Sequence, residues 1–70
     1  MHELALIGVH IVRLRRERRM SQEELALLSG RTRAYLSGLE AGRRNVTVKT
    51  LKSVAVALDV EVIDFFRPLP

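Results

Sequence analysis

Apolar residues recur at intervals of three and four positions near the start of the chain. Ile7, Ile11 and Leu14 have the i, i+4, i+7 spacing that gathers side chains on one face of an α-helix. Gly8 falls inside this stripe and weakens it locally. The pattern predicts a first helix over about residues 4–18.

The next apolar positions lie between a helix start signal and a helix stop signal. Ser21, followed three residues later by Glu24, has the spacing of a capping box. Leu25 begins the apolar run, and Gly30 is a typical residue just after a helix C-terminus. These signals predict a second helix over residues 22–29.

A third helix is expected over residues 33–41. Thr32 is a favourable N-cap, because its side-chain oxygen can accept a hydrogen bond from a free N–H of the first turn. Leu36 and Leu39 form the inner face of this helix, and Gly42 ends it.

The last part of the chain predicts two further helices. Thr47 caps one over residues 48–58, and a shorter one over about residues 61–66 stops before Pro68, whose ring cannot continue a helix. The inward positions of the longer helix are Val48, Leu51, Val54, Ala55 and Leu58. The segments together predict an all-α fold, a compact five-helix domain that occupies residues 1–70 as a single unit.

Small residues mark the junction of the second and third segments. Ala26 and Gly30 have an A-x3-G spacing. A helix-turn-helix needs a small residue where its two helices cross and a turn residue that tolerates positive φ. Between two capped helices, this spacing predicts a helix-turn-helix.

Composition narrows the classes of function. A chain of 70 residues with 47% apolar residues can form one small domain and is not intrinsically disordered. It has no Cys, and His2 and His10 are too far apart for a usual zinc set, so no metal or other cofactor is expected. No apolar run reaches membrane-spanning length and the start lacks a signal-peptide pattern, so we expect a cytoplasmic protein with no membrane partner.

The positive charges are concentrated in two arginine clusters. The chain has 12 Lys and Arg against 8 Asp and Glu, a formal net charge of +4. Arginines gather in RLRRERR, residues 13–19, and in AGRRN, residues 41–45. Because the planar guanidinium forms paired hydrogen bonds with phosphate, these clusters indicate a phosphate-bearing partner.

The outward face of the predicted third helix is nearly bare. Opposite its leucines it presents Ala34, Ser37 and Gly38, with Arg33 and Tyr35 at the flanks. Either another helix packs on this face or the major groove of DNA approaches it, because small residues let a helix descend into the groove. The nearby arginines favour DNA, with Arg33 placed to bond guanine O6 and N7.

Residues at the ends of the neighbouring helices are candidates for contacts with DNA phosphates. Gln22 opens the second helix, where free N–H groups and the helix dipole favour an anion. The other candidates follow the third helix or open the fourth: Arg43, Arg44, Asn45 and Thr47. The alternatives are that Gln22 is an ordinary exposed residue and that the two arginines belong to a solvated basic loop.

Along nearly its whole length the chain resembles the Cro/phage-repressor (XRE-like) type of helix-turn-helix domain, which implies a lambda-repressor-like fold. The matching elements are Ile7-Gly8, Ile11, Leu14-Arg15, Ser21-Gln22, Leu25-Ala26, Gly30, Leu36-Ser37, Leu39-Glu40, Gly42, Leu51, Ala55 and Leu58. The resemblance implies that Arg15 and Glu40 form a buried structural ion pair and do not contact DNA.

Within that family, the stretch RAYLSGLEAGRRNVTVKTL, residues 33–51, is similar to the controller proteins of restriction–modification systems. This resemblance implies a small dimer that binds palindromic operators. It also implies that the bases are read by Arg33, Ala34, Tyr35 and Ser37. Two positions depart from the pattern: Arg31 replaces a commonly apolar turn residue, and Ala34 can offer only apolar contact to a thymine methyl group.

The fifth segment carries more apolar residues than one short helix can bury in a monomer of this size. They are Val60, Val62, Ile63, Phe65 and Phe66. We expect part of this set to close the core and the rest to contact a second copy across a twofold axis. Two recognition helices would then read half-sites about 34 Å apart. The alternative is that the whole set caps the core.

The sequence thus predicts a sequence-specific dimeric transcriptional regulator that binds double-stranded DNA in the bacterial nucleoid, with RNA polymerase as a candidate further partner. A phage-type repressor or antitoxin-like autoregulator is the alternative with the same fold, and a protein-interaction or coactivator module is the alternative of another class. An enzyme is not expected, because the adjacent Glu23 and Glu24 face different directions and have no nucleophile or metal set beside them. No small-molecule ligand is expected either, since there is no second domain.

Overall fold

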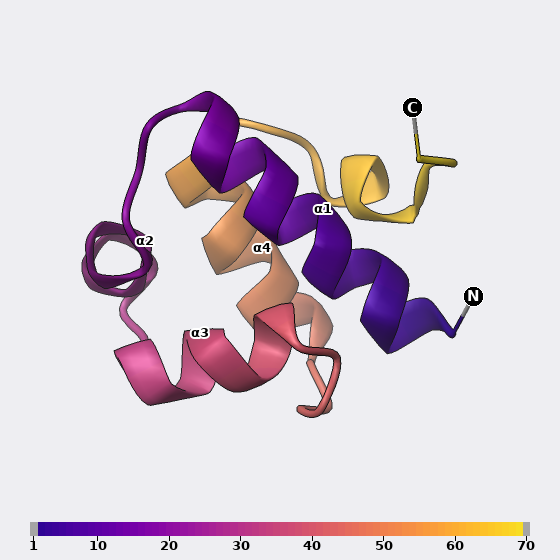
Figure 1. Ribbon diagram of the computed structural model, residues 1–70, viewed down its shortest axis with the longest axis horizontal. Coiled ribbons are helices and arrows are strands. Elements are labelled where there is room, and N and C mark those ends of the chain that lie inside the picture. Colours follow the sequence, from indigo (N-terminus) through magenta and orange to yellow (C-terminus); the bar gives the residue numbers. More distant parts are fainter. Residues whose placement is uncertain (1, 70) are drawn as a thin grey trace.

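The computed structural model describes residues 2–69, and Figure 1 shows how its helices are arranged. The elements are α1 (Glu3–Glu17), α2 (Gln22–Ser29), α3 (Arg33–Glu40), α4 (Val48–Leu58) and η1 (Val62–Phe66). Met1 and Pro70, which the expected domain includes, lie outside the described residues. No helix within residues 2–69 has both the length and the apolar character needed to cross a membrane.

The last helix differs from its prediction. The all-α class is confirmed, but the expectation of five α-helices is wrong, because η1 is a 3₁₀ helix. It has only five residues, and such short helices commonly take the tighter 3₁₀ form. Its start is fixed by Asp64, whose Oδ2 accepts a hydrogen bond from the backbone N–H of Glu61 at 2.9 Å.

Side chains from all the helices meet in one apolar core. In Figure 1, α1 crosses the front of the molecule, with α4 behind it, α3 below it and η1 at its side. The buried apolar residues are Ile7, Ile11, Leu14, Leu25, Ala26, Leu36, Leu39, Leu51, Val54, Ala55, Leu58 and Phe65. Because burial of apolar surface is the main favourable term in folding, this core holds the α2–α3 pair against α1 and α4.

The α2–α3 pair forms through the capping residues that the sequence signals. Ser21 and Glu24 make a capping box at the start of α2. The side chain of Thr32 accepts a hydrogen bond from the N–H of Tyr35 at 3.0 Å and so caps α3. Gly30 ends α2 with φ +71°, a left-handed conformation that glycine adopts without strain. This turn sets the direction in which α3 leaves α2.

Gly8 lies at the crossing of α1 and α3, a role that its low helix propensity did not suggest. A Cβ atom on Gly8 would lie 2.7 Å from the carbonyl oxygen of Leu39, and it would also overlap the carbonyl of Glu40. Both obstacles are backbone atoms of α3, so they cannot rotate away as a side chain could. Gly8 therefore permits the close crossing that seats the C-terminal end of α3 on α1.

The C-terminal segment is tied to α1 by a buried histidine. The Nε2 atom of His10 lies 2.7 Å from the carbonyl oxygen of Arg67, and its Nδ1 lies 3.0 Å from Nη2 of Arg13. Because a guanidinium can only donate hydrogen bonds, Nδ1 accepts and the Nε2–H donates. The bond to Arg67 holds the chain that follows η1 beside α1, and the bond from Arg13 lies within α1.

Candidate nucleic-acid interface

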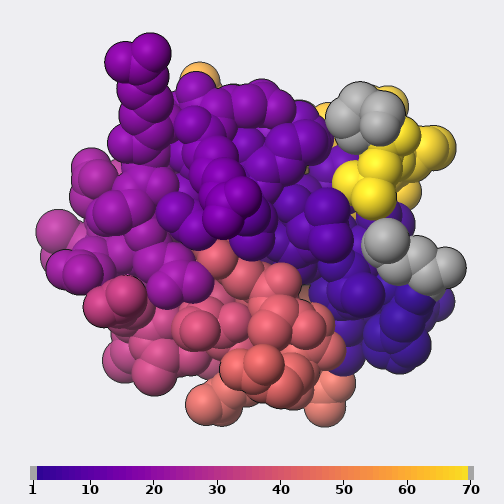
Figure 2. Space-filling model, in the orientation of Figure 1, coloured from indigo at the N-terminus to yellow at the C-terminus, as the bar shows by residue number. Residues whose placement is uncertain are grey.

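The outward side of α3 and the loop after it form a continuous exposed strip. Figure 2 shows the segment from α2 through α3 to this loop, coloured purple to salmon, along the left and lower sides of the molecule. Leu36 and Leu39 close the inner side of α3. Arg33, Ala34 and Ser37 are exposed, so three of the four base-reading candidates share the outward side.

Tyr35, the fourth base-reading candidate, lies between two arginines. The guanidinium carbons of Arg31 and Arg44 are 5.9 Å and 5.5 Å from the centroid of its ring. Both distances are within the range of cation–π contacts. The hydroxyl of Tyr35 donates a long hydrogen bond to the carbonyl oxygen of Asn45 at 3.4 Å. The half-buried ring therefore connects α3 to the turn before it and to the loop after it.

The centre of the outward side is covered, which corrects the expectation of a bare face. Gly38 is buried, and a Cβ atom at this position would lie 2.7 Å from Cγ of Arg44. The aliphatic stem of Arg44 crosses the glycine, as long basic side chains often cover neighbouring surface while their charge stays in water. The sequence assigned Arg44 to the phosphate backbone beyond the helix, whereas the structure places it on α3 beside Tyr35.

Arg33 makes weak contacts that leave it available to a ligand. Its Nη1 lies 3.4 Å from Oε1 of Glu23, and its Nε lies 3.5 Å from Oε1 of Gln22. The side chains of Arg33 and Glu23 are 66% and 73% exposed. An ion pair this exposed contributes at most about 1 kcal/mol. Little therefore opposes the transfer of Arg33 from α2 to a base edge.

A buried ion pair joins α3 to α1 at the two positions where the family resemblance implies one. Nε and Nη2 of Arg15 lie 2.8 Å and 3.1 Å from Oε2 and Oε1 of Glu40. Gln22 donates a further hydrogen bond from Nε2 to Oε1 of Glu40 at 2.8 Å. The charge of the carboxylate at the end of α3 is thereby offset by Arg15 and turned inward, so it does not repel an approaching polyanion.

This contact gives Gln22 a structural role in addition to the phosphate contact that the sequence predicts. The sequence suggested that Gln22 binds phosphate at the start of α2. Its side-chain amide bridges to α3, with Nε2 bonded to Glu40 and Oε1 facing Arg33. The spacing along the chain does not signal such a contact, because it depends on how the two helices cross.

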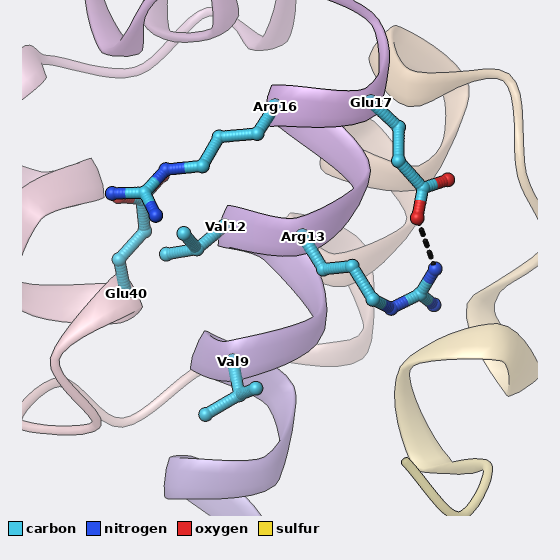
Figure 3. Close-up of a pocket in the computed structure, with 6 residues that line it drawn as sticks. All are labelled: Val9, Val12, Arg13, Arg16, Glu17 and Glu40. Carbon is cyan, nitrogen blue, oxygen red and sulfur yellow. Dashed lines mark hydrogen bonds and ion pairs between the residues drawn. The ribbon is translucent and has the colours of Figure 1, made fainter. Parts of the chain in front are cut away.

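A surface hollow over α1 lies beside the same ion pair and was not predicted. It is lined by Val9, Val12, Arg13, Arg16, Glu17 and Glu40. Figure 3 shows Arg16 extending from α1 towards Glu40, while Arg13 is paired with Glu17 at 2.7 Å between Nη1 and Oε2. Arg16 and Glu40 thus lie on the wall of the same hollow.

The remaining phosphate candidates lie in the loop between α3 and α4. Arg43 and Asn45 are exposed. Thr47 caps α4, where its Oγ1 accepts a hydrogen bond from the N–H of Thr50 at 3.1 Å. Gly42 turns the chain at the end of α3 with φ +74°, so that the loop folds back along the outward side of the helix.

The apolar set at η1 is divided between the core and the surface. Phe65 was a candidate for the dimer interface, but it is fully buried and closes the core, where its ring cannot contact a second copy. Val60 and Val62 are partly buried against the same core. Ile63 and Phe66 are 61% and 45% exposed and remain the candidates for such a contact.

The chain belongs to the helix-turn-helix family, whose sequence profile matches residues 11–65. It is 48% identical over 63 residues to y4dJ, an uncharacterized HTH-type transcriptional regulator of Sinorhizobium fredii. That match covers 90% of this chain and 82% of the relative. The resemblance to the Cro/phage-repressor type, stated from the motifs, is confirmed.

Solved structures of controller proteins have a similar fold. The restriction–modification controller protein C.AhdI from Aeromonas hydrophila is similar with a TM-score of 0.87 and 41% identity, covering 90% of this chain and 96% of that one. The controller C.Esp1396I, solved as a tetramer in complex with its natural 35 base-pair operator, is similar with a TM-score of 0.84 and 36% identity. That match covers 94% of this chain and 87% of the controller.

Proposed function

We propose that this protein is a homodimeric, sequence-specific DNA-binding regulator of transcription that acts as the controller of a restriction–modification system. The observation that carries the proposal is the outward side of α3, where Arg44 lies over Tyr35 and the same helix exposes Arg33. The acid of the same helix, Glu40, is turned inward and paired. A helix side that presents guanidinium groups and hides its carboxylate is complementary to DNA.

In this proposal α3 enters the major groove with its N-terminal residues at the base edges. The base-reading residues are Arg33, Ala34, Tyr35 and Ser37. Arg33 bonds a guanine, and Ala34 contacts a thymine methyl group. The phosphate contacts, which position the protein without reading sequence, come from Gln22, Arg43, Arg44, Asn45 and Thr47.

The proposed homodimer is formed through the exposed apolar residues of η1. Ile63 and Phe66 expose surface that a second copy can cover, and a twofold contact presents the same patch from both subunits. Such a dimer reads a palindrome, and the tetramer of C.Esp1396I on its operator supports self-association on DNA in a similar protein. RNA polymerase at the same promoter is the further partner that this role involves.

The test is binding of the protein to DNA from upstream of its own gene, measured by fluorescence anisotropy against a shuffled duplex of equal length. We expect the upstream duplex to bind about a thousandfold or more tightly at physiological salt. Equal affinity for the two duplexes would contradict the proposal.

A pair of variants separates the recognition surface from general positive charge. R33A removes a charge from the outward side of α3, and K52A removes the same charge from the exposed side of α4. We expect R33A to lose affinity for the upstream duplex and K52A to retain it. Equal losses would show that net charge, and not α3, determines the affinity.

A further inference from the structure

Three large apolar side chains are exposed around one hollow between α2 and α4. Leu27 and Leu28 of α2 are 81% and 61% exposed, and Val56 of α4 is 72% exposed. All three line the same hollow, together with Ser29, Gly30, Lys49, Lys52 and Ser53. Single exposed apolar residues are ordinary on a protein surface, but a group that shares one hollow marks an interaction site.

The charge around this α2–α4 hollow has one sign. Its charged lining residues within the described part of the chain are Lys49 and Lys52. Both are exposed residues of α4, on the rim of the apolar floor. An apolar floor with a purely positive rim is complementary to a surface that is apolar in the middle and acidic at the sides.

The α2–α4 hollow differs in its residues from the exposed strip along α3, which we propose binds DNA. DNA offers little apolar surface to two leucines, and protein–DNA interfaces are more polar than protein–protein interfaces. The acids of α2 are not paired with these lysines. Glu24 accepts a hydrogen bond from the backbone N–H of Ser21 at 3.0 Å, and Glu23 lies 3.4 Å from Arg33. The complement of the lysines is therefore expected on another molecule.

We propose that the α2–α4 hollow docks an acidic amphipathic helix of a second protein. The apolar stripe of that helix packs on Leu27, Leu28 and Val56, as amphipathic helices pack in apolar grooves. Glutamates or aspartates beside the stripe pair with Lys49 and Lys52 and set the orientation. This surface goes beyond DNA binding, because it allows the regulator to hold a partner protein while α3 faces the duplex.

The test uses two designed helical peptides that differ in charge alone. Both carry leucines at i, i+3, i+4 and i+7; one has glutamates at the flanking positions and its twin has lysines there. Binding to the full-length protein is followed by anisotropy and by amide chemical shifts. We expect the glutamate peptide to bind at least about tenfold more tightly than its twin, with shifts centred on α2 and α4. Equal binding, or no binding of either peptide, would overturn the proposal.

Charge reversal supplies the matched control. The variant K49E/K52E is expected to prefer the lysine peptide, whereas R18E/R19E, with the same change of charge in the exposed turn after α1, is expected to keep the original preference. The variant L27S/L28S should bind both peptides poorly. All of the substituted side chains are exposed. The melting temperature of each variant, measured by circular dichroism, should therefore stay within a few degrees of that of the wild type.

The same variants, peptides and duplex distinguish two other occupants of the hollow, a second copy of this chain and DNA. If L27S/L28S changes the sedimentation coefficient of the free protein, the hollow is a contact between copies of this chain and the proposal is overturned. If the upstream DNA duplex displaces the glutamate peptide, the lysines belong to the DNA site, which also overturns it. An unchanged oligomer and simultaneous binding of peptide and duplex support the proposal. Loss of specific DNA binding would contradict the proposed function without changing the result for the peptides.

Discussion

The carboxylate of Glu40 is bound by the guanidinium of Arg15 through two hydrogen bonds, at 2.8 Å and 3.1 Å. Both side chains are largely buried, one at the end of α3 and the other on α1. A buried charge depends on its partner, because it has lost its hydration. The pair therefore fixes the end of α3 on α1 and, with it, the direction in which the outward side of α3 faces.

Removing one member of this pair should strongly destabilise the protein. In R15M the carboxylate of Glu40 keeps its hydrogen bond from Gln22 but loses the positive charge that paired with it. We therefore expect the free energy of unfolding to fall by about 3–5 kcal/mol. Urea unfolding followed by circular dichroism measures this loss. The double variant R15M/E40L is the control, since it leaves no unpaired charge, and it should be clearly more stable than R15M. A double variant as unstable as the single one would argue against the charge explanation.

The crossing of α1 and α3 can be tested at Gly8. G8A adds a Cβ atom against the backbone of Leu39, and overpacking of this kind costs about 1–3 kcal/mol despite the better helix propensity of alanine. G30A is the comparison, because no described atom lies within 4 Å of a Cβ built there and its penalty arises from the positive φ alone, about 1–2 kcal/mol. We expect G8A to have the lower melting temperature. A wild-type melting temperature for G8A would show that the helices do not approach so closely.

Asp64 makes the stability of the η1 region depend on acid. A hydrogen bond from Arg67 first, and one from the backbone N–H of Glu61 second, lower the pKa of Asp64 below its usual value. Because the folded-state pKa is depressed, this stabilisation is complete above the unfolded-state pKa and is lost as the pH falls through the folded-state pKa. D64N should therefore lose less stability than the wild type on acidification below about pH 4. The melting temperature as a function of pH measures this. If the melting temperature of D64N falls at low pH as steeply as that of the wild type, Asp64 is not the cause of the fall.

The neighbouring phenylalanines of η1 should respond in opposite ways. F66D places a charge on an exposed apolar residue, so we expect sedimentation velocity to show a folded monomer for F66D and the proposed dimer for the wild type. F65A empties a core position and should cost about 3–5 kcal/mol of folding free energy. A dimeric F66D would place the interface elsewhere on the surface.

Arginines on the outward side of α3 should differ in what they recognise. R33A is expected to lose about 1–3 kcal/mol of binding free energy at the cognate site and to relax the preference at one base pair. R44A is expected to weaken binding to all duplexes alike and to reduce the salt slope by about one. Binding to a panel of single-substitution duplexes distinguishes the two. An equal loss for R33A on every duplex would remove Arg33 from base reading.

Local signals along the chain were sufficient for most of the fold. The residues that cap α2 and α3 bond to backbone groups only a few residues away, so their spacing alone locates the ends of these helices. They are Ser21, Glu24, Gly30 and Thr32. The leucines of α3 follow from helical periodicity in the same way. The exposed position of Arg33 then follows, because a helix with one side in the core must turn the other side outward.

Features that depend on how helices cross could not be read in this way. Gly8 looked like a weak point of a helix, because its neighbour on α3 is more than thirty residues away. Gly38 looked exposed because the position of the Arg44 side chain is set by the folded loop. Phe65 and Phe66 could not be assigned to core or surface, since the angle between successive side chains differs between an α-helix and the 3₁₀ helix that forms.

The central claim is that two copies of this chain place their α3 helices in successive major grooves of a palindromic site. Hydroxyl-radical footprinting of the protein on DNA upstream of its own gene tests this most directly. We expect two symmetric protected regions with centres about 34 Å apart, and we expect them to disappear together in F66D. Protection without twofold symmetry, or protection that does not depend on DNA sequence, would contradict the claim.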